Sequence, residues 1–414
     1  MSKPLAVVIG GSLGGLLAAN LMRSIGWDAL VFERNAEDLT SRGAGLGTHA
    51  QLLEILRRIG IPFDDSMGVK LDTLICLDVG GNVILERPTV RTMTAWARLF
   101  HSIKGALPPE NYRLGMALER VEQGERVTAV FANGARIEGD LLIGADGIRS
   151  TVREQFLPQA QPQYAGYVAW RAMLEESEIP GDIRAAIFER YSFCLPEGEQ
   201  LLGYPVPGRN NDTQVGRRAY NIVWYRPTDM ATLAALCTDA DGRQHGMAIP
   251  PPLIRSEVIA EIKATCRALI APQLAEIFAR TPRPFFQPIF DLESSQLAFG
   301  RVVIVGDAAF VARPHVGAGV TKAAIDCASL ADVVAASSGD LDAALARYQR
   351  QQRQFGSELV AVAREHGAYL SAQLKPREQR TPEELYRDVE SVVLSHSGRS
   401  EKVRGLVTGR PTAG

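Results

Sequence analysis

The stretch VVIGGSLGG, close to the N-terminus, has the residue types and the spacing that bind a pyrophosphate. Gly10, Ser12 and Gly15 stand where a dinucleotide-binding turn has three glycines. The first makes the tight turn, the second lets the backbone approach the phosphates, and the third lets the helix pack on the strand. The N-terminus of the helix then offers free N–H groups and a positive dipole end to phosphate. Ser12 departs from the pattern, because it places a small side chain at the point of closest approach.

An acidic residue completes this unit. Glu33 lies 18 residues after Gly15, at the end of the second expected strand, DALVFER, where a carboxylate accepts hydrogen bonds from ribose hydroxyls. A glycine-rich turn that binds no ligand is the alternative interpretation. The turn and the acid together predict a dinucleotide, and they do not distinguish NAD from FAD.

A second strand-to-glycine turn, RVVIVGDAAFVARPHVGAG, starts at Arg301. A nicotinamide dinucleotide needs one such turn, whereas the longer flavin needs a further contact for its ribityl chain and ring. Asp307, at the carboxyl end of a buried strand, is placed to accept from ribityl hydroxyls. Gly317 and Gly319 let backbone N–H groups approach the flavin ring. Asp307 as the cap of an ordinary helix is the alternative, but the joint occurrence of the two turns favours FAD.

The elements that must position these turns follow from hydrophobic periodicity. Residues 5–33 form a strand, a helix from about Gly14 to Ile25 and a second strand, and this βαβ half-unit predicts a parallel sheet with both faces covered. The further expected elements are a helix ending at Gly60, a hairpin around Gly80 to Asn82, four strands between 120 and 147, an antiparallel sheet over 164–226, a helix to about Ala271, a strand at 301–305 followed by a helix, and a largely helical section from about Leu341.

Composition excludes several classes of protein. The 414 residues carry 45 basic and 47 acidic side chains, interspersed along the chain, with a formal net charge of −2, so nucleic acid is not an expected partner. The longest apolar runs have strand length, which excludes a membrane span, and the first residues lack a secretory pattern, so we expect a cytoplasmic protein. Five cysteines, odd in number and in no CxxC pair, indicate neither disulfides nor a metal site.

Three motifs, in order and at suitable separation, resemble the fingerprints of the single-component FAD-dependent aromatic hydroxylases that share the p-hydroxybenzoate hydroxylase fold. They are VVIGGSLGG with Glu33, IGADGIRSTVR and VIVGDAAFVARPHVGAG. The resemblance covers about the first 350 residues. Within the family, YAGYVAWRAML, YPVPGRN and RPHVGAGVTKAAIDCASLA look most like the hydroxypyridine monooxygenases.

The resemblance implies a set of cofactor contacts. The ADP part of FAD would be held by Gly10, Ser12, Leu13, Gly14, Gly15 and Glu33, with Arg34 beside the adenosine, Asp146 and Gly147 in the family's Asp-Gly motif, Asp307 on the ribityl chain, and Pro314, Gly317, Ala318 and Gly319 along the isoalloxazine. Three positions depart from the family. Trp96 stands about where the family has an Arg, and Arg42 is the candidate substitute for that contact. Phe310 replaces a His, and Lys322 replaces an Asn.

The resemblance also implies the reaction. NAD(P)H reduces FAD, O2 adds to the flavin C4a, and the hydroperoxide transfers an OH group to an electron-rich ring, here a hydroxypyridine. The protein positions the ring, excludes water and supplies a proton acceptor. The expected partners are therefore a small aromatic or heteroaromatic substrate, O2 and NAD(P)H.

Few side chains are candidates for contact with the substrate. His49, in GLGTHAQ, and His315, beside Pro314, are candidate bases because either can titrate near neutrality, and the alternative for each is a hydrogen-bonded loop residue. Tyr204 corresponds to a position that related enzymes use for substrate, and its alternative is a core tyrosine whose OH bonds the backbone. Of the others, Trp170 and Trp224 are either pocket wall or core, Arg171 is an ion-pair partner or an anion clamp, and His245, His366 and His396 are expected at the surface.

The expected architecture is α/β. A Rossmann-like FAD-binding domain comes from residues 1–70, 95–163 and 285–340, an inserted antiparallel-sheet substrate domain from 71–94 and 164–284, and a helical C-terminal section from 341–414. The amphipathic segment ELVAVAREHGAYLSAQL in that last section has an apolar face to bury on its own chain or on a partner, and we expect a homodimer.

Three competing interpretations stay open. The same scaffold serves hydroxylases of other rings, such as salicylate-like or urate-like substrates, and flavin-dependent halogenases, whose paired-tryptophan motif this sequence lacks. A non-catalytic dinucleotide sensor is the interpretation from a different class, and such a protein has no need of the ribityl contact at Asp307.

Overall fold

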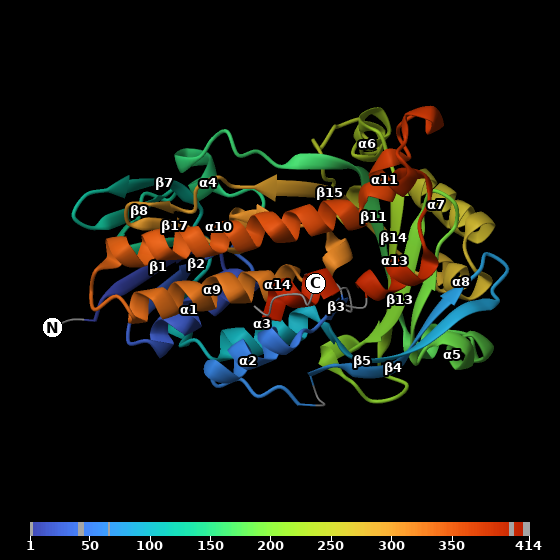
Figure 1. The fold of residues 1–414 in the computed structure, drawn as a ribbon, viewed down its shortest axis with the longest axis horizontal. Helices are drawn as coiled ribbons and strands as arrows, with labels where there is room; N and C mark the ends of the chain where they lie inside the picture. The colour runs from blue at the N-terminus through green and yellow to red at the C-terminus, as the bar shows by residue number, and fades with distance from the viewer. Residues whose placement is uncertain (1–2, 40–44, 65–66, 397–400, 409–414) are drawn as a thin grey trace.

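The structure is a computed structural model that describes residues 3–39, 45–64, 67–396 and 401–408. A six-stranded sheet at one end of the molecule carries both glycine turns (Figure 1). Its strands, in spatial order, are β16 (Ala298–Phe299), β17 (Val302–Ile304), β10 (Leu141–Gly144), β1 (Leu5–Ile9), β2 (Asp28–Phe32) and β6 (Tyr112–Arg113). The pairs from β17 to β6 are parallel, and β16 runs antiparallel. Strands that are buried on both faces read as continuous apolar runs, as LAVVI and VVI do here.

Helices and a small sheet cover the two faces of this sheet. α1 (Leu13–Ser24) packs against β1, β2 and α9 (Gly319–Ala335), and α10 (Leu341–His366) packs on α9. A three-stranded antiparallel sheet of β7 (Leu118–Gln123), β8 (Val127–Phe131) and β9 (Arg136–Gly139) adds side chains to the same core. The βαβ unit predicted for residues 5–33 is thus confirmed by β1, α1 and β2.

A nine-stranded sheet fills the other end of the molecule (Figure 1). In spatial order its strands are β18 (Phe310–Val311), β15 (Phe285–Glu293), β11 (Gln163–Glu175), β14 (Ala219–Pro227), β13 (Gln200–Val206), β12 (Arg190–Cys194), β4 (Val69–Leu77), β5 (Val83–Ala95) and β3 (Gly45–Gly47). The predicted hairpin around Gly80 to Asn82 is confirmed, because β4 and β5 pair antiparallel. The antiparallel sheet predicted over 164–226 is confirmed by β11, β12, β13 and β14, whereas β12 and β4 run parallel. Short turns impose antiparallel pairing on consecutive strands, and β4 enters this sheet from a distant part of the chain.

Helices cover both faces of the large sheet. On one face, α7 (Ser256–Leu269) and α8 (Pro272–Arg280) bury an apolar core that includes Trp170 and Trp224. On the other face, Tyr167, Tyr204 and Tyr225 pack with side chains of α11 (Ala368–Ala372) and α13 (Val389–His396). The remaining helices are α2 (Ala50–Arg58), α3 (Trp96–Gly105), α4 (Thr151–Phe156), α5 (Gly181–Ile187), α6 (Met230–Leu236), α12 (Pro382–Leu385) and α14 (Glu401–Thr408).

The C-terminal section buries its apolar face on its own chain. Leu345, Tyr348 and Val360 of α10 join the core of the six-stranded sheet, and the Tyr348 hydroxyl donates to the carbonyl oxygen of Ile304 at 3.0 Å. α14 packs against α10, with Val403 and Leu359 in one small apolar cluster. The apolar face that motivated the expectation of a homodimer is therefore covered within one chain, and the homodimer stays a prediction.

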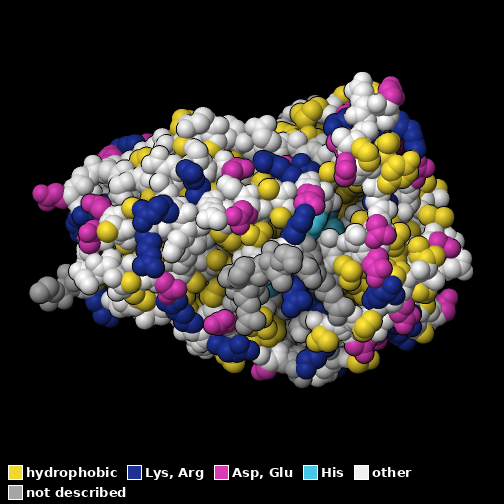
Figure 2. All heavy atoms as spheres, in the orientation of Figure 1, with side chains coloured by type: hydrophobic (Ala, Val, Ile, Leu, Met, Phe, Trp, Pro, Cys, Tyr) yellow, Lys and Arg dark blue, Asp and Glu magenta, His cyan; other side chains and the backbone are white. Residues whose placement is uncertain are grey.

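Two further expectations concern the surface and the domain bounds. The face shown in Figure 2 mixes basic, acidic and apolar side chains, as the interspersed charges of the sequence predict. Among the described residues, no helix combines the length and the apolar character that crossing a bilayer requires.

The large sheet is extended by residues outside 71–94 and 164–284, namely those of β3, β15 and β18. The domain bounds expected from the sequence stay a prediction.

Phe310 shows why one position departs from the family pattern. Its side chain is 1 % exposed and lies against Gly356 in the middle of α10. A Cβ at Gly356 would lie 2.3 Å from a ring carbon of Phe310. The aromatic ring thus occupies space that the missing side chain of α10 leaves open.

We expect Gly356→Ala to lower the free energy of unfolding, because the new methyl group overpacks the Phe310 contact at a cost of about 1–3 kcal/mol. At a helix position with free space, the same change raises the free energy of unfolding by about 1 kcal/mol. A decrease therefore indicates the Phe310 contact, and an increase indicates free space. Urea unfolding followed by circular dichroism measures it. Gly105→Ala is the matched control, since a Cβ there meets no heavy atom within 4 Å. Equal shifts of the two midpoints would contradict the contact.

Candidate active site

The first glycine turn is held by backbone contacts that exclude side chains. Gly10 has φ 108°, and a Cβ there would lie 2.3 Å from the carbonyl oxygen of Ala145, at the end of the neighbouring strand β10. A Cβ at Gly15 would lie 1.8 Å from the carbonyl oxygen of Gly10. Both positions of the predicted fingerprint therefore require glycine.

The N-terminus of α1 is open toward a ligand. Ser12 occupies the capping position with an extended backbone, but its hydroxyl makes no capping hydrogen bond. Leu13 is buried, whereas Gly14 is half-buried and a Cβ there would meet its nearest neighbour, Ala323, at 3.9 Å. The Ser12 hydroxyl and the first N–H groups of the helix are thus suited to a phosphate.

Glu33 is buried at 5 % exposure and is already anchored to the turn. Its carboxylate accepts from the backbone N–H of Gly11 at 2.9 Å and from that of Asn35 at 3.0 Å. Tyr112, a residue that no sequence motif singles out, donates its hydroxyl to the carbonyl oxygen of Gly11 at 2.9 Å. The Asn35 side-chain amide also donates to this carboxylate, so about one of its roughly four acceptor sites remains for a ribose hydroxyl.

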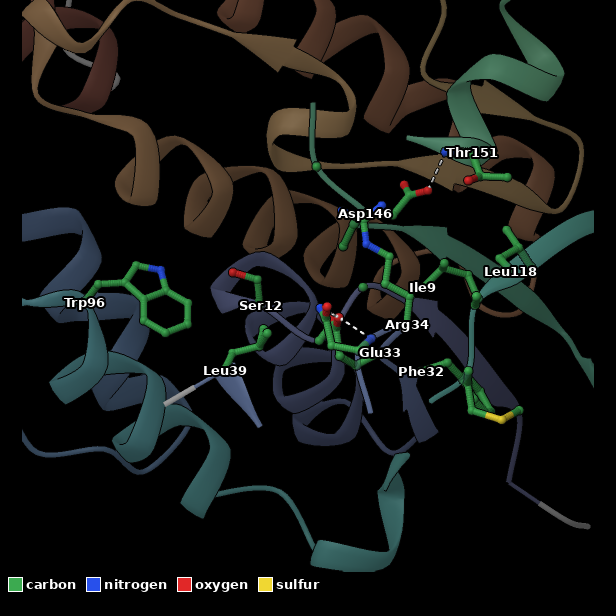
Figure 3. A pocket seen from close by; sticks show the side chains of 17 residues that line it. Ile9, Ser12, Phe32, Glu33, Arg34, Leu39, Trp96, Leu118, Asp146 and Thr151 are labelled. Atoms are coloured by element: carbon green, nitrogen blue, oxygen red, sulfur yellow. Dashed lines mark hydrogen bonds between the residues drawn. The ribbon is translucent and has the colours of Figure 1, made fainter. Parts of the chain in front are cut away.

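These residues line one cavity of about 310 Å³ (Figure 3). Arg34 is exposed at its mouth, and Trp96, stacked on Phe100, lies across from the turn. Trp96 presents a flat apolar surface where the family has a charge, and Arg42, the candidate substitute, lies outside the described residues. The lining comprises Ile9, Gly10, Gly11, Ser12, Phe32, Glu33, Arg34, Asn35, Leu39, Trp96, Met116, Ala117, Leu118, Ala145, Asp146, Gly147 and Thr151.

Asp146 also lines this cavity, but its carboxylate is committed to the chain. It accepts from the Ser150 hydroxyl at 2.6 Å and from the backbone N–H of Thr151 at 2.7 Å, so it caps α4 (Figure 3). Burial raises the pKa of Asp146, and these hydrogen bonds oppose the shift. The role of the Asp-Gly motif in this structure is to fix the loop between β10 and α4.

The second glycine turn lies at the carboxyl end of β17. Gly306 has φ 62°, and its N–H donates to the buried carboxylate of Asp326 at 2.9 Å. Asp307 is open to solvent, yet desolvation by the surrounding protein raises its pKa, as expected for a group on a concave wall. Lys322, fully buried in place of the family's Asn, reaches Asp326 at 3.5 Å. The i, i+4 spacing of these two residues could have indicated the pair.

The loop that follows presents backbone toward the middle of the molecule. Pro314 begins a short 3-10 turn, Gly317 ends it with φ 59°, and Ala318 is buried. Gly319 begins α9, and a Cβ there meets no heavy atom within 4 Å. Their predicted contact with the isoalloxazine stays a prediction.

His49 lies between the two ends of the molecule. It follows β3, and its Nδ1 forms a hydrogen bond of 3.1 Å with the Thr321 hydroxyl of α9. Its Nε2 is buried and has no hydrogen-bond partner among the described residues. Burial, reinforced by the charge of Arg91, lowers its pKa to about 4, so the ring is neutral at pH 7.

Tyr204 and the large tryptophans occupy core positions. The Tyr204 hydroxyl donates to the carbonyl oxygen of Gly45 at 2.8 Å, which ties β13 to β3. Trp170 and Trp224 are paired across β11 and β14 and are at most 2 % exposed, so they are core rather than pocket wall. Arg171 is half-buried and donates to the Gln287 side chain.

His315 belongs to a buried chain of hydrogen bonds. Its Nε2 lies 2.7 Å from the Tyr167 hydroxyl, and its Nδ1 lies 3.1 Å from Nε2 of His396. The expectation of a surface position is therefore wrong for His396, which is 5 % exposed, while His245 and His366 are half-buried. The spacing of apolar residues in the short helix that carries His396 does not indicate that this side chain is buried.

Arg91 is the site residue that sequence reasoning missed. It lies on β5, is 7 % exposed, and donates from Nη1 to the carbonyl oxygen of His396 at 2.7 Å. Its guanidinium touches Gly47, where a Cβ would lie 2.2 Å from Nη2. The strand β5, VILERPTVRTMTA, carries several other polar residues, so its sequence contains no signal that Arg91 is buried. Among the described residues, no group of His, Cys, Asp and Glu could hold a metal ion.

Comparison with known proteins shows the cofactor. Residues 4–66 match the model of an FAD binding domain, and residues 164–291 match a model described as FAD binding domain-like. The first of these contains the open helix N-terminus and the anchored carboxylate. The prediction of FAD from the two glycine turns is confirmed, and the roles of single residues stay predictions.

Two relatives of known function and one solved structure resemble most of the chain. It is 29% identical over 352 residues to the 2,6-dihydroxypyridine 3-monooxygenase of Paenarthrobacter nicotinovorans, which covers 84% of this chain and 87% of that protein. It is 27% identical over 345 residues to the 6-hydroxynicotinate 3-monooxygenase of Bordetella bronchiseptica, with coverage of 79% and 82%. The solved 2,6-dihydroxypyridine-3-hydroxylase of Arthrobacter nicotinovorans has a TM-score of 0.83 at 27% identity, over 93% of this chain and 97% of that one. The predicted fold class is confirmed.

We expect Gly15→Ala to weaken FAD binding about 10- to 100-fold, because overpacking of about 1–3 kcal/mol changes affinity tenfold per 1.4 kcal/mol. Titration of FAD into the stripped protein, followed by flavin fluorescence, measures this. Gly14→Ala is the matched control for the fold, since its Cβ meets only an ordinary contact at 3.9 Å. Wild-type affinity and unfolding temperature in Gly15→Ala would contradict the tight turn.

The buried histidines predict a loss of stability in acid. Burial lowers the pKa of His396 to about 3, that of His49 to about 4, and that of His315 well below 6.5. The unfolded chain therefore binds more protons below pH 6.5, and each histidine removes up to about 1.4 kcal/mol per pH unit until its folded pKa is reached. Urea midpoints between pH 7 and 5 should fall, and the fall should be shallower in His396→Gln. If the urea midpoints of wild type and His396→Gln fell equally between pH 7 and 5, a buried neutral His396 would be contradicted.

Proposed function

We propose that this chain, which is an FAD-dependent aromatic-ring monooxygenase that uses NAD(P)H and O2, hydroxylates a hydroxypyridine. The observation that carries the proposal is the convergence of His49, Tyr204 and the Gly317 turn where the two sheets meet, next to the FAD-binding turns. Two relatives that align with most of the chain are named for hydroxypyridine substrates, which supports this ring class.

The residues of the first cavity would hold the ADP part of FAD. The Ser12 hydroxyl and the N-terminus of α1 would bind the pyrophosphate, Glu33 the ribose, and Asp307, across the sheet edge, the ribityl chain. When bound, FAD supplies the electron transfer from NAD(P)H and the activation of O2. The protein then has to bind the ring, orient it and keep water away.

The aromatic face of the large sheet is suited to excluding water. Tyr191, Tyr204 and Tyr225 are each at most 5 % exposed. Tyr191 packs edge-on against Tyr204, and Tyr225 packs against His315. A closed aromatic wall keeps competing water out of reach of the reactive oxygen.

His49 is the candidate base that the geometry favours. Both ring nitrogens of His315 are used, by Tyr167 and by His396, so its proton-accepting capacity is committed. His49 is neutral at pH 7 and keeps Nε2 unpartnered among the described residues, so this nitrogen can accept a hydrogen bond from a ring hydroxyl. Pro314 would shape the backbone beside the ring, and the Tyr204 hydroxyl would hold β3 in place. Cytoplasmic location and the homodimer stay predictions.

Anaerobic reduction tests the proposal. We expect NADH or NADPH to bleach the FAD absorbance of the purified protein slowly alone and much faster with 2,6-dihydroxypyridine or 6-hydroxynicotinate. Salicylate and urate are the comparison rings, and product analysis after O2 is admitted identifies the hydroxylated position. Acceleration by salicylate or urate alone would move the substrate class to that ring. Reduction that no ring accelerates would remove the hydroxypyridine assignment.

A further inference from the structure

Arg91 is a buried cation at the meeting point of the predicted catalytic segments. Its guanidinium lies against Gly47, two residues before His49, and Nη2 is 3.3 Å from where a Cβ of Gly317 would stand. It also lies above the ring of Tyr191, 5.9 Å from the ring centroid. β3, β5, β12 and the second glycine turn, which are distant in sequence, therefore all border this one side chain.

The charge of Arg91 has no counter-charge within the described residues. It forms no ion pair there, and its hydrogen bond to the His396 carbonyl oxygen uses one of five N–H donors. The guanidinium groups of other buried arginines have more partners. Arg313 forms a forked pair with Asp291 at 2.8–3.0 Å, and Arg153 donates to three backbone carbonyl groups.

The neighbours of Arg91 leave the site positive. The side chains that feel its charge are His49, His396, Tyr191 and Tyr204, all neutral at pH 7. An arginine cannot shed its proton, and a buried charge without a partner is costly. A site built in this way is completed by an anion that arrives with a ligand.

We propose that Arg91 binds an anionic oxygen of the ring substrate, so that the enzyme takes up its hydroxypyridine in the ionised form. The planar fork of an arginine matches an oxygen anion on a planar ring or its carboxylate. An ionised ring oxygen donates electrons to the ring carbons, which the hydroxylation requires. This inference rests on the proposed function and deepens it by naming the charge state that the pocket selects.

Ring binding by the holoenzyme tests this role. 2,6-Dihydroxypyridine, 6-hydroxynicotinate and salicylate are titrated into wild type, Arg91→Gln, Arg91→Lys and Arg190→Gln, and the flavin spectrum reports the dissociation constants. We expect Arg91→Gln to weaken binding of the preferred ring about 10- to 100-fold, as loss of a charge-assisted hydrogen bond does. Arg91→Lys should recover part of the loss, and Arg190→Gln, which removes a half-buried arginine of β12 in the same sheet, should bind as wild type.

The FAD dissociation constant separates the possible outcomes. It should stay at the wild-type value in Arg91→Gln, since the charge serves the ring. A rise in the FAD dissociation constant with unchanged ring binding would assign the charge to the cofactor and overturn the inference, as would unchanged ring binding by itself. If salicylate proves the preferred ring and Arg91→Gln weakens it, the hydroxypyridine proposal fails while the role of Arg91 stands. Wild-type holoenzyme that binds none of the rings would overturn both.

Discussion

The structure depends on the side-by-side arrangement of three parallel strands, β1, β10 and β17, whose carboxyl ends reach one edge of a sheet. Contact at this edge is so close that the carbonyl oxygen of Ala145 occupies the space of a Gly10 side chain, and that of Gly10 the space of a Gly15 side chain. Backbone packed this tightly cannot relax by a change of rotamer. The dinucleotide turn, the capped loop at Asp146 and the second glycine turn are therefore fixed relative to one another before any ligand binds.

The region around His49 is built differently, from side chains that tie together segments distant in the sequence. Tyr204 ties β13 to β3, His49 ties the same loop to α9 through Thr321, and His315 joins the second glycine turn to His396. Each of these contacts joins two segments that are far apart in the sequence. The position of the ring relative to the flavin then depends on buried polar contacts, which hold only when every partner is in place.

The fingerprints could be predicted because each one is local. Gly10, Gly15 and Glu33 lie within one βαβ unit, and Asp307 follows its own strand, so spacing alone places them. Arg91 and His396 could not be predicted, because their neighbours come from β3, β12 and α13, and register between distant segments is not written in any one of them. Periodicity on α13 reports which side of the helix is apolar, and it does not report that His396 meets another histidine inside the molecule.

The order of the strands also governs how the protein forms during its synthesis. β1 leaves the ribosome first, but its sheet is complete only when β17 follows about 300 residues later, a delay of roughly 15 to 60 s at ordinary translation rates. His396, which completes the interior around Arg91, is made later still. A nascent chain therefore exposes the unpaired edge of an apolar parallel strand for most of its translation, a state that molecular chaperones shield from aggregation.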